Sequence, residues 1–390
     1  MIYGNYIEDQ VLLYGSLYHD QSSAGFTTHS NVVLGGKMWI YLQWGTAGPN
    51  SDLYIAGNYH TQPVAGGCGS QEHAPTCPDN VTVEANTLVP AGQQWPPAAR
   101  AIISAAGVRR CGSSRGGGRR AAMALVKPRP NHPARSQDHL LQTDVSDEMT
   151  AATTVVRRCF SPHGLPALKY SGSNVSAALT MILDGMAGSF DVCGMRQITT
   201  DFRQVAVTHS QHLLIAGKAQ PLPPRLTAAF HVTGTLNLTQ LLFGNRDISA
   251  AGGDNTGGGV YLGGGGALAA TDVIFANLSA NHGGAVYIGD SSAGAFTECT
   301  FVGNKATAGW GGGGAVAVFP GAAAVFMRCR FVQNKAYLGG AIWSNGAVHV
   351  EQCVFDGNAA TGQGGGLVVA DGSAAALNIS SSSFVRRLRC

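Results

Sequence analysis

The stretch FVQNKAYLGGA, residues 331–341, contains a pattern that recurs along the C-terminal half of the chain. A phenylalanine begins each copy, an asparagine follows three residues later in most copies, and a pair of glycines comes next. The steps between copies vary from 24 to 32 residues, which is typical of a solenoid whose repeats stack on one another. The phenylalanines are Phe301, Phe331, Phe355 and Phe384, the asparagines are Asn304, Asn334 and Asn358, and the second glycines are Gly259, Gly284, Gly314, Gly340 and Gly366.

The apolar segments inside each repeat are short and alternate with polar residues, as in VHVEQCVF at 348–355. A helical repeat would need apolar residues spaced three and four apart over about ten positions. Short alternating segments separated by glycine, asparagine and serine instead predict strands joined by tight turns. The sequence therefore predicts an all-β fold in which each repeat is one coil of a right-handed parallel β-helix.

Each recurring residue has a physical role in such a coil. Phenylalanines one coil apart should stack inside the core, about 4.8 Å from one another. Asparagine tolerates the left-handed backbone conformation of a corner, and its amide can hydrogen-bond to the asparagine of the next coil. Cys299, Cys329 and Cys353 each precede a phenylalanine by two residues. Alternation places them on the same inward face, which favours small buried side chains over a reactive or metal-binding trio.

The first hundred residues contain a second set of coil-like phrases, such as IYGNYIED at 2–9 and YIAGNYHT at 54–61. Their asparagines recur at steps of 26, 27 and 28 residues. The run ends in QQWPPAARAIISAAGV (93–108), where two prolines precede a helical apolar pattern and a glycine. We expect a short helix here that caps the end of a β-helix. The asparagines of this set are Asn5, Asn31, Asn58 and Asn86.

The repeats divide the chain into three parts. Residues 1–107 are predicted to be the C-terminal coils and cap of a first β-helix. Residues 173–390 are predicted to be a second β-helix that starts with a short capping helix. Residues 108–172 contain the basic run RRCGSSRGGGRR (109–120) and no repeat, which predicts a largely disordered linker. Both ends of the chain fall inside repeats, so we expect coils to be missing at both ends, as in a fragment or an imperfect gene model.

Composition argues against several classes of protein. Charged residues make up 12 % of the chain and the net charge is +3, which argues against global disorder and against a nucleic-acid partner. No apolar run has the length of a transmembrane helix, and the N-terminus lacks the pattern of a signal peptide. Five sequons nevertheless favour an extracellular or cell-surface glycoprotein. They are at Asn80, Asn174, Asn237, Asn277 and Asn378.

Two cysteines near one another offer a disulfide. Cys68 and Cys77 bracket a loop that contains glycine and proline, and a bond between them would close a small ring. A zinc site on Cys68, His73 and Cys77 is the alternative, but it lacks a fourth ligand at any usual spacing. We expect neither a metal nor another cofactor.

With the repeats aligned, two resemblances emerge. Residues 230–390 resemble the polymorphic outer membrane protein repeat, which carries GGA followed by an aliphatic residue, and FxxN, once per coil. This resemblance implies adhesion or surface display. The residues that carry it are Gly283-Gly284-Ala285, Gly313-Gly314-Ala315 and Gly339-Gly340-Ala341, together with the Phe and Asn positions above.

Residues 1–107 resemble the last coils and cap of secreted β-helix proteins of the pectin-lyase superfamily. GSLYHDQSSAGF (15–26), the asparagine phrases and the WPPAARAII ending carry the likeness. It implies a role with polysaccharides. Gln21 stands where related sequences often carry an acid, which puts a catalytic activity in doubt.

The sequence favours a carbohydrate-associated binding or structural role, with polysaccharides or cell-wall and matrix glycans as partners. Tyr18, Trp39 and Trp44 are the candidates for stacking on sugar rings. Lys305 and Lys335 follow the repeated asparagine, and Arg246 takes the same place in LFGNR. These three would form a stripe on one outer edge that either contacts acidic polysaccharide or is simply a solvated face.

The alternative function is a polysaccharide lyase or glycoside hydrolase that acts through residues 1–60. A hydrolase needs two carboxyl groups about 5–10 Å apart. Asp9, His19 and Asp20 are the candidate catalytic residues, and the last two lie in a predicted loop, where functional residues gather.

Overall fold

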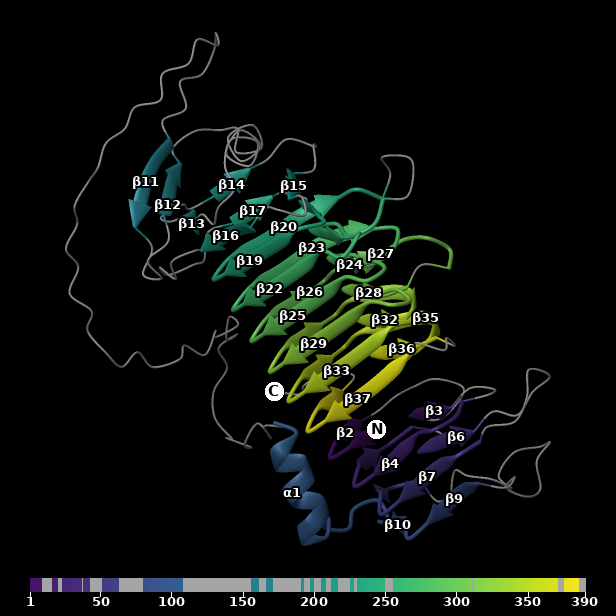
Figure 1. The fold of residues 1–390 in the computed structure, drawn as a ribbon. Helices are drawn as coiled ribbons and strands as arrows, with labels where there is room; N and C mark the ends of the chain where they lie inside the picture. The colour runs from purple at the N-terminus through teal and green to yellow at the C-terminus, as the bar shows by residue number, and fades with distance from the viewer. Residues whose placement is uncertain are drawn as a thin grey trace, which may run out of the picture.

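The computed structural model describes residues 1–107 and 230–385, apart from 9–15, 20–22, 37, 43–50, 63–79, 250–254, 311 and 371–374, and the backbone of several strands between 156 and 227. Three long parallel sheets run along a solenoid, and the chain passes from one sheet to the next in every coil (Figure 1). Because parallel strands need crossovers between them, neighbouring strands of one sheet come from different coils. The sequence prediction of a nearly all-β solenoid is confirmed.

Sheet 1 has eleven strands. In order they are β16 (His212–Ala216), β19 (Thr235–Thr239), β22 (Ala267–Thr271), β25 (Ala293–Thr297), β29 (Ala323–Met327), β33 (Ala347–Glu351), β37 (Ala376–Ser380), β1 (Ile2–Tyr3), β4 (Thr27–His29), β7 (Leu53–Ala56) and β9 (Val81–Glu84).

Sheet 2 has fifteen strands. They are β10 (Thr87–Leu88), β8 (Tyr59–His60), β5 (Val32–Leu34), β2 (Tyr6–Glu8), β38 (Ser383–Val385), β34 (Val354–Asp356), β30 (Arg330–Val332), β26 (Thr300–Val302), β23 (Ile274–Ala280), β20 (Leu242–Asp247), β17 (Arg225–Thr227) and β14 (Gln197–Thr199), with β27 (Lys305–Ala306), β31 (Lys335–Leu338) and β35 (Ala359–Gln363) alongside.

Sheet 3 has seven strands, and a two-stranded sheet takes the same place in the N-terminal coils. The seven are β15 (Val205–Val207), β18 (Phe230–Val232), β21 (Val260–Leu262), β24 (Val286–Ile288), β28 (Val316–Val318), β32 (Ile342–Ser344) and β36 (Leu367–Val369), and the pair is β3 (Leu17–His19) and β6 (Ile40–Leu42).

The core is built from columns of like residues, one from each coil. The predicted stack of phenylalanines is confirmed, with neighbouring ring centroids 4.3 to 5.2 Å apart. Its inner members are fully buried, and each contributes roughly 1.5–3 kcal/mol by removal of its side chain from water. The column runs through Phe243, Phe275, Phe301, Phe331, Phe355 and Phe384.

Both predicted asparagine ladders form. Asn334 is fully buried, and its Oδ1 accepts hydrogen bonds from the backbone N–H and the side-chain amide of Asn304 at 3.0 and 2.9 Å. Asn31 does the same for Asn5, at 3.1 and 3.0 Å. The left-handed residue of each corner, however, is the one before the asparagine, such as Ser30 (φ 54°) and Gln333 (φ 54°). The ladder, and not corner geometry, is therefore what requires asparagine.

The glycine pairs are needed because two coil segments come into close contact at this corner. The first glycine has a positive φ, 68° at Gly313. A Cβ on the second would lie 2.1 Å from the carbonyl oxygen of Gly340 and 2.6 Å from the backbone of Lys335, in the case of Gly314. The register shows that the equivalent glycines in the outer copies are Gly258 and Gly365, one residue before the positions expected from the sequence.

The three cysteines lie buried and free at one corner, as the alternating pattern predicts. Cys329 donates its backbone N–H to the Sγ of Cys353 at 3.3 Å. Burial raises the pKa of the Cys299 and Cys329 thiols above the usual value, so both are held in the protonated, unreactive form.

The two predicted β-helix segments form one stack, joined out of chain order. Strand β1 pairs with β37, and β2 pairs with β38, so the first coil of the chain lies directly on its last described coil. Figure 1 shows the purple N-terminal strands continuing the stack that ends in yellow. Residues 1–107 therefore extend the same solenoid, whereas the repeats predict a separate one.

The predicted helix forms as α1, residues Pro97–Ala105, with proline at its first position. It does not cover the end of the solenoid, as a cap would. It packs against outward side chains of sheet 2 instead, where Ala99 is in one cluster with Tyr6, Val32 and Val385. No helix among the described residues is long and apolar enough to cross a membrane.

The expected linker, residues 108–172, contains two short strands, and a third strand that lies beyond it pairs with one of them. β11 (Val156–Phe160) and β12 (Pro166–Tyr170) pair antiparallel, and β13 (Asp191–Val192) lies beside β12. The basic run at 109–120 and the capping helix expected from residue 174 lie outside the described residues.

Candidate functional site

A row of aromatic rings covers the outer face of sheet 3. In strands β18, β21, β24 and β32 of this sheet the outer two residues are buried and the middle one points out. From β18 to β36 the middle residues lie in register from coil to coil, and they are His231, Tyr261, Tyr287, Ala317, Trp343 and Val368. Tyr261 and Tyr287 stack with their ring planes 4° apart and their centroids 4.9 Å apart. Four of these six side chains are aromatic and form one surface.

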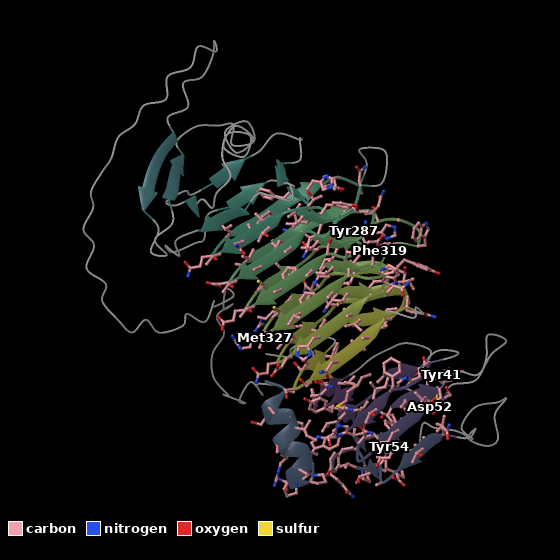
Figure 2. All side chains as sticks on the ribbon, in the orientation of Figure 1. Tyr41, Asp52, Tyr54, Tyr287, Phe319 and Met327 are labelled. Atoms are coloured by element: carbon pink, nitrogen blue, oxygen red, sulfur yellow. The ribbon has the colours of Figure 1, made fainter. Side chains whose placement is uncertain are left out.

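Phe319 fills the gap that Ala317 leaves in the row. It lies two residues further along the chain, and its ring centroid is 4.6 Å from that of Tyr287 and 5.0 Å from that of Trp343. Figure 2 shows Tyr287 and Phe319 together on this side of the solenoid. The rings of Tyr261, Tyr287, Phe319 and Trp343 thus follow one another without a break, and we name these four the aromatic stripe.

A second pair of rings lies beside the stripe. His282, which is buried, contacts Phe319 edge-on at 6.1 Å between centroids and Trp310 at 4.4 Å. The backbone N–H of Gly312 donates to Nδ1 of His282 at 3.3 Å, so this nitrogen is the acceptor. Trp310 is 70 % exposed, the most exposed of the large hydrophobic side chains in the described residues. A tryptophan held open to water beside a row of rings is typical of a binding surface.

Glycines make room for these rings. A Cβ at Gly263 would lie 2.8 Å from the ring of Tyr261, and one at Gly289 would lie 3.1 Å from the ring of Tyr287. Gly312 packs in the same way under Trp343, where a Cβ would come within 2.5 Å of Cγ. The four rings of the stripe are half-buried, so part of each stays in contact with the solvent.

The stripe carries no formal charge. Its members are Tyr, Phe and Trp, and the residues two positions after Tyr261, Tyr287 and Trp343 are Gly263, Gly289 and Asn345. Such a surface can stack on apolar faces of a ligand and hydrogen-bond through tyrosine hydroxyls and the tryptophan N–H, but it cannot neutralise an acidic ligand.

The predicted basic stripe does not form as expected. Lys305 pairs in register with Lys335, but the column continues to Ala359 on one side and through Ser279 to Asp247 on the other. Arg246 pairs with Leu278 and is therefore one position out of line. Lys305 helps to lower the pKa of Asp247, although hydrogen bonds from Ser249 have the larger effect.

Two of the predicted residues of the N-terminal coils, Trp39 and His19, are buried and not at a surface site. Trp39 is fully buried and stacks on His60 at 4.8 Å, so its role is in the core. His19 is also buried, and desolvation lowers its pKa to about 4, which makes it a packed neutral side chain and not a surface acid or base. Among the described residues, no group of His, Cys, Asp and Glu is arranged to hold a metal.

Other predicted positions stay predictions. Asp9, Asp20, Trp44, Cys68, His73, Cys77 and Asn174 lie outside the described residues, and of Tyr18 only the backbone is described. Among the sequons, Asn80 and Asn277 are exposed, and Asn237 and Asn378 are half-buried.

Sequence reasoning missed the aromatic stripe although its signal is present. The phrases VYLG (260–263), VYIG (286–289), VAVF (316–319) and IWSN (342–345) align at the glycine corner that precedes each of them. Each phrase looks like a plain apolar run. The aromatic row becomes visible only when the outward middle residues of the four phrases are compared with one another. The exchange of ring positions between Ala317 and Phe319 hides the regularity further.

Comparison with known proteins supports the fold. Residues 241–387 match a family model described as "Right handed beta helix region". No curated protein and no solved structure matches the chain. The match covers strands of all three sheets, and the N-terminal coils extend those of sheets 1 and 2. The solenoid is therefore a right-handed parallel β-helix.

Proposed function

We propose that this protein binds neutral polysaccharides through the aromatic stripe of sheet 3. The observation that carries the proposal is the unbroken row of outward rings, with steps of 4.6 to 5.0 Å, beside the exposed Trp310. Sugar rings present apolar C–H faces and peripheral hydroxyls, and aromatic side chains with polar edges complement both. A row longer than one ring suits a chain of sugars better than a single one.

Several features of the stripe support a neutral glycan. Its rings carry no charge, and the basic column expected for an acidic polysaccharide is interrupted by Ala359, Ser279 and Asp247. A location outside the cell or at its surface, where such glycans occur, is part of the same proposal, and so is a structural or adhesive role there. For the alternative of glycan cleavage, no observation on the described residues favours an active site.

The test must separate binding from stability, because stacked rings also stabilise a solenoid. Trp310→Ala removes a side chain that is 70 % exposed, so folding should be almost unaffected. The matched control is Tyr54→Ala, which removes an aromatic side chain that is 45 % exposed on β7, a strand of sheet 1 in the N-terminal coils. Affinity electrophoresis in gels that contain neutral or acidic polysaccharides measures retention of each variant.

We expect the wild-type protein to be retarded by at least one neutral polysaccharide. Trp310→Ala should weaken that binding about tenfold, which corresponds to about 1.4 kcal/mol, with an unchanged melting temperature. Tyr54→Ala should bind like the wild type. Retardation only by acidic polysaccharides, or equal loss in both variants, would overturn the proposal.

A further inference from the structure

The contact between the first and last described coils has the hydrogen bonds of an ordinary coil-to-coil contact. Tyr6 donates its backbone N–H to the carbonyl oxygen of Ser382 at 2.9 Å, and Ile379 donates to that of Met1 at 2.9 Å. The side chain of Asn5 accepts from the N–H of Ser382 at 2.9 Å and donates to the carbonyl of Ile379 at 3.3 Å. The column of Cys353 and Ser382 thus continues into Asn5, although the two coils are far apart in the sequence.

The core is continuous there as well. Leu377 and Phe384 pack against the apolar clusters on both sides of the contact. Ile7 continues the phenylalanine column in register with Phe384 and is only 4 % exposed.

Helix α1 adds a further contact on the outer face of sheet 2. Its Ala99 and the preceding Trp95 pack with Val385 of the last described strand and with Tyr6 and Val32 of the first coils. Residues 1–106 therefore contact the last described coil in three ways: by strand pairing, by apolar core packing and by the outer packing of helix α1.

All of these contacts are non-covalent, and they do not depend on which chain supplies each side. We propose that residues 1–106 are a docking module that completes the β-helix of a second copy of this chain as well as its own. Exchange of an identical element between copies uses contacts already present in the closed monomer, so it needs no new interface. At low concentration the module of the same chain has the advantage, because its effective concentration is high.

Two full-length variants with complementary defects test this exchange. Ile7→Asp places a charge in the module and leaves the acceptor coil intact. Phe384→Asp places a charge in the acceptor coil and leaves the module intact. Neither variant can close on itself, but the intact module of the second fits the intact acceptor of the first. The matched control is Leu88→Asp, at the exposed far end of the same column.

Light scattering after gel filtration gives the readout. We expect each variant alone to be a monomer and an equimolar mixture, refolded together, to contain a heterodimer of twice the monomer mass. Leu88→Asp should add no dimer with either variant. A mixture that holds only monomers would overturn the proposal.

A second measurement covers the case in which either variant fails to fold. Two wild-type chains with different tags are unfolded together and refolded at high concentration. Co-purification of the two tags in a dimer, absent when both chains carry Ile7→Asp, supports exchange. Refolded wild-type chains that never form a mixed dimer would overturn it.

Discussion

The backbone N–H of Ser382 donates a hydrogen bond to the side-chain Oδ1 of Asn5 at 2.9 Å, across 377 positions of sequence. This bond joins the column of Cys329 and Cys353 to the N-terminal asparagine ladder. In this column the backbone N–H of each residue donates a hydrogen bond to the side chain of the next residue. The order is Cys329, Cys353, Ser382 and Asn5. The column continues through Asn31 and Asn58 to Asn86. The N-terminal coils are therefore the continuation of the C-terminal ones.

The asparagine ladder should be essential to stability. Asn334→Ala removes the acceptor for the backbone N–H of Asn304 and the donor to the carbonyl of Phe301, both of them buried. Buried groups left unpaired cost about 1–3 kcal/mol each, so we expect a loss of about 3 kcal/mol in the free energy of unfolding. Guanidinium denaturation measures it. A loss below about 1 kcal/mol would show that the ladder contributes little.

Two glycine-to-alanine changes separate the effect of a steric clash from the general effect of replacing a glycine. A Cβ at Gly314 would lie 2.1 Å from the carbonyl oxygen of Gly340, whereas a Cβ at Gly309 would have no atom within 4 Å. Gly314→Ala should therefore cost about 3 kcal/mol or more by forcing two coils apart, while Gly309→Ala should stay within about 0.5 kcal/mol of the wild type. Thermal unfolding of both variants gives the comparison. Equal melting temperatures would contradict the close packing of this corner.

The cysteine column should accept serine and resist valine. Ser382 already occupies this column and receives the N–H of Cys353 at 3.0 Å. Cys353→Ser keeps an acceptor for the N–H of Cys329, and we expect a change within about 1 kcal/mol. Cys353→Val is similar in size but leaves that N–H unpaired, so it should cost about 1–3 kcal/mol. A higher free energy of unfolding for Cys353→Val than for Cys353→Ser, measured by denaturation, would refute this role for the column.

Acid should weaken the N-terminal coils. Burial lowers the pKa of His19 to about 4, and burial also lowers the pKa of His60, opposed by its hydrogen bond to the carbonyl of Gln62. The unfolded chain binds a proton on each histidine near pH 6.5 and the folded chain does not. Stability is therefore complete above pH 6.5 and falls as the pH drops toward 4, by about 3 kcal/mol for His19.

Comparison with His19→Leu isolates this effect from the titration of carboxylates. The free energy of unfolding of the wild type should decline more steeply between pH 6.5 and 4.5 than that of the variant. Parallel pH profiles for the two proteins would mean that His19 is not buried in its neutral form.

The coils could be predicted from the sequence because the residues that build them, above all phenylalanine and asparagine, recur once in every coil. Phe331 and Asn334 lie next to copies of themselves in space, so a repeat in sequence is a column in the structure. The aromatic stripe escaped notice because only one residue per strand faces outward there, and because Phe319 replaces Ala317 in the row. To predict the stripe, one must know which residues of each three-residue strand face the solvent. The alternation of apolar and polar residues in so short a strand does not decide this.

The junction of the two ends could not be predicted for a different reason. Stacking order in a solenoid usually follows chain order, and here it does not. A local signal did exist, since Ser382-Ser383-Phe384 and Asn5-Tyr6-Ile7 occupy the same three columns. Their residue types differ, however, and only the shared geometry of corner, outward and inward positions relates them.

A disulfide across the junction tests the central relationship most directly. Tyr3 and Ser380 are register partners on neighbouring parallel strands, so Tyr3→Cys with Ser380→Cys places two thiols within the Cα separation that a disulfide spans. Thr297→Cys with Met327→Cys, register partners in consecutive coils, is the matched control. Under mild oxidation and peptide mapping by mass spectrometry, a stack with residues 1–106 on its last described coil predicts that both pairs cross-link. A cross-link in the control pair and none between positions 3 and 380 would contradict it.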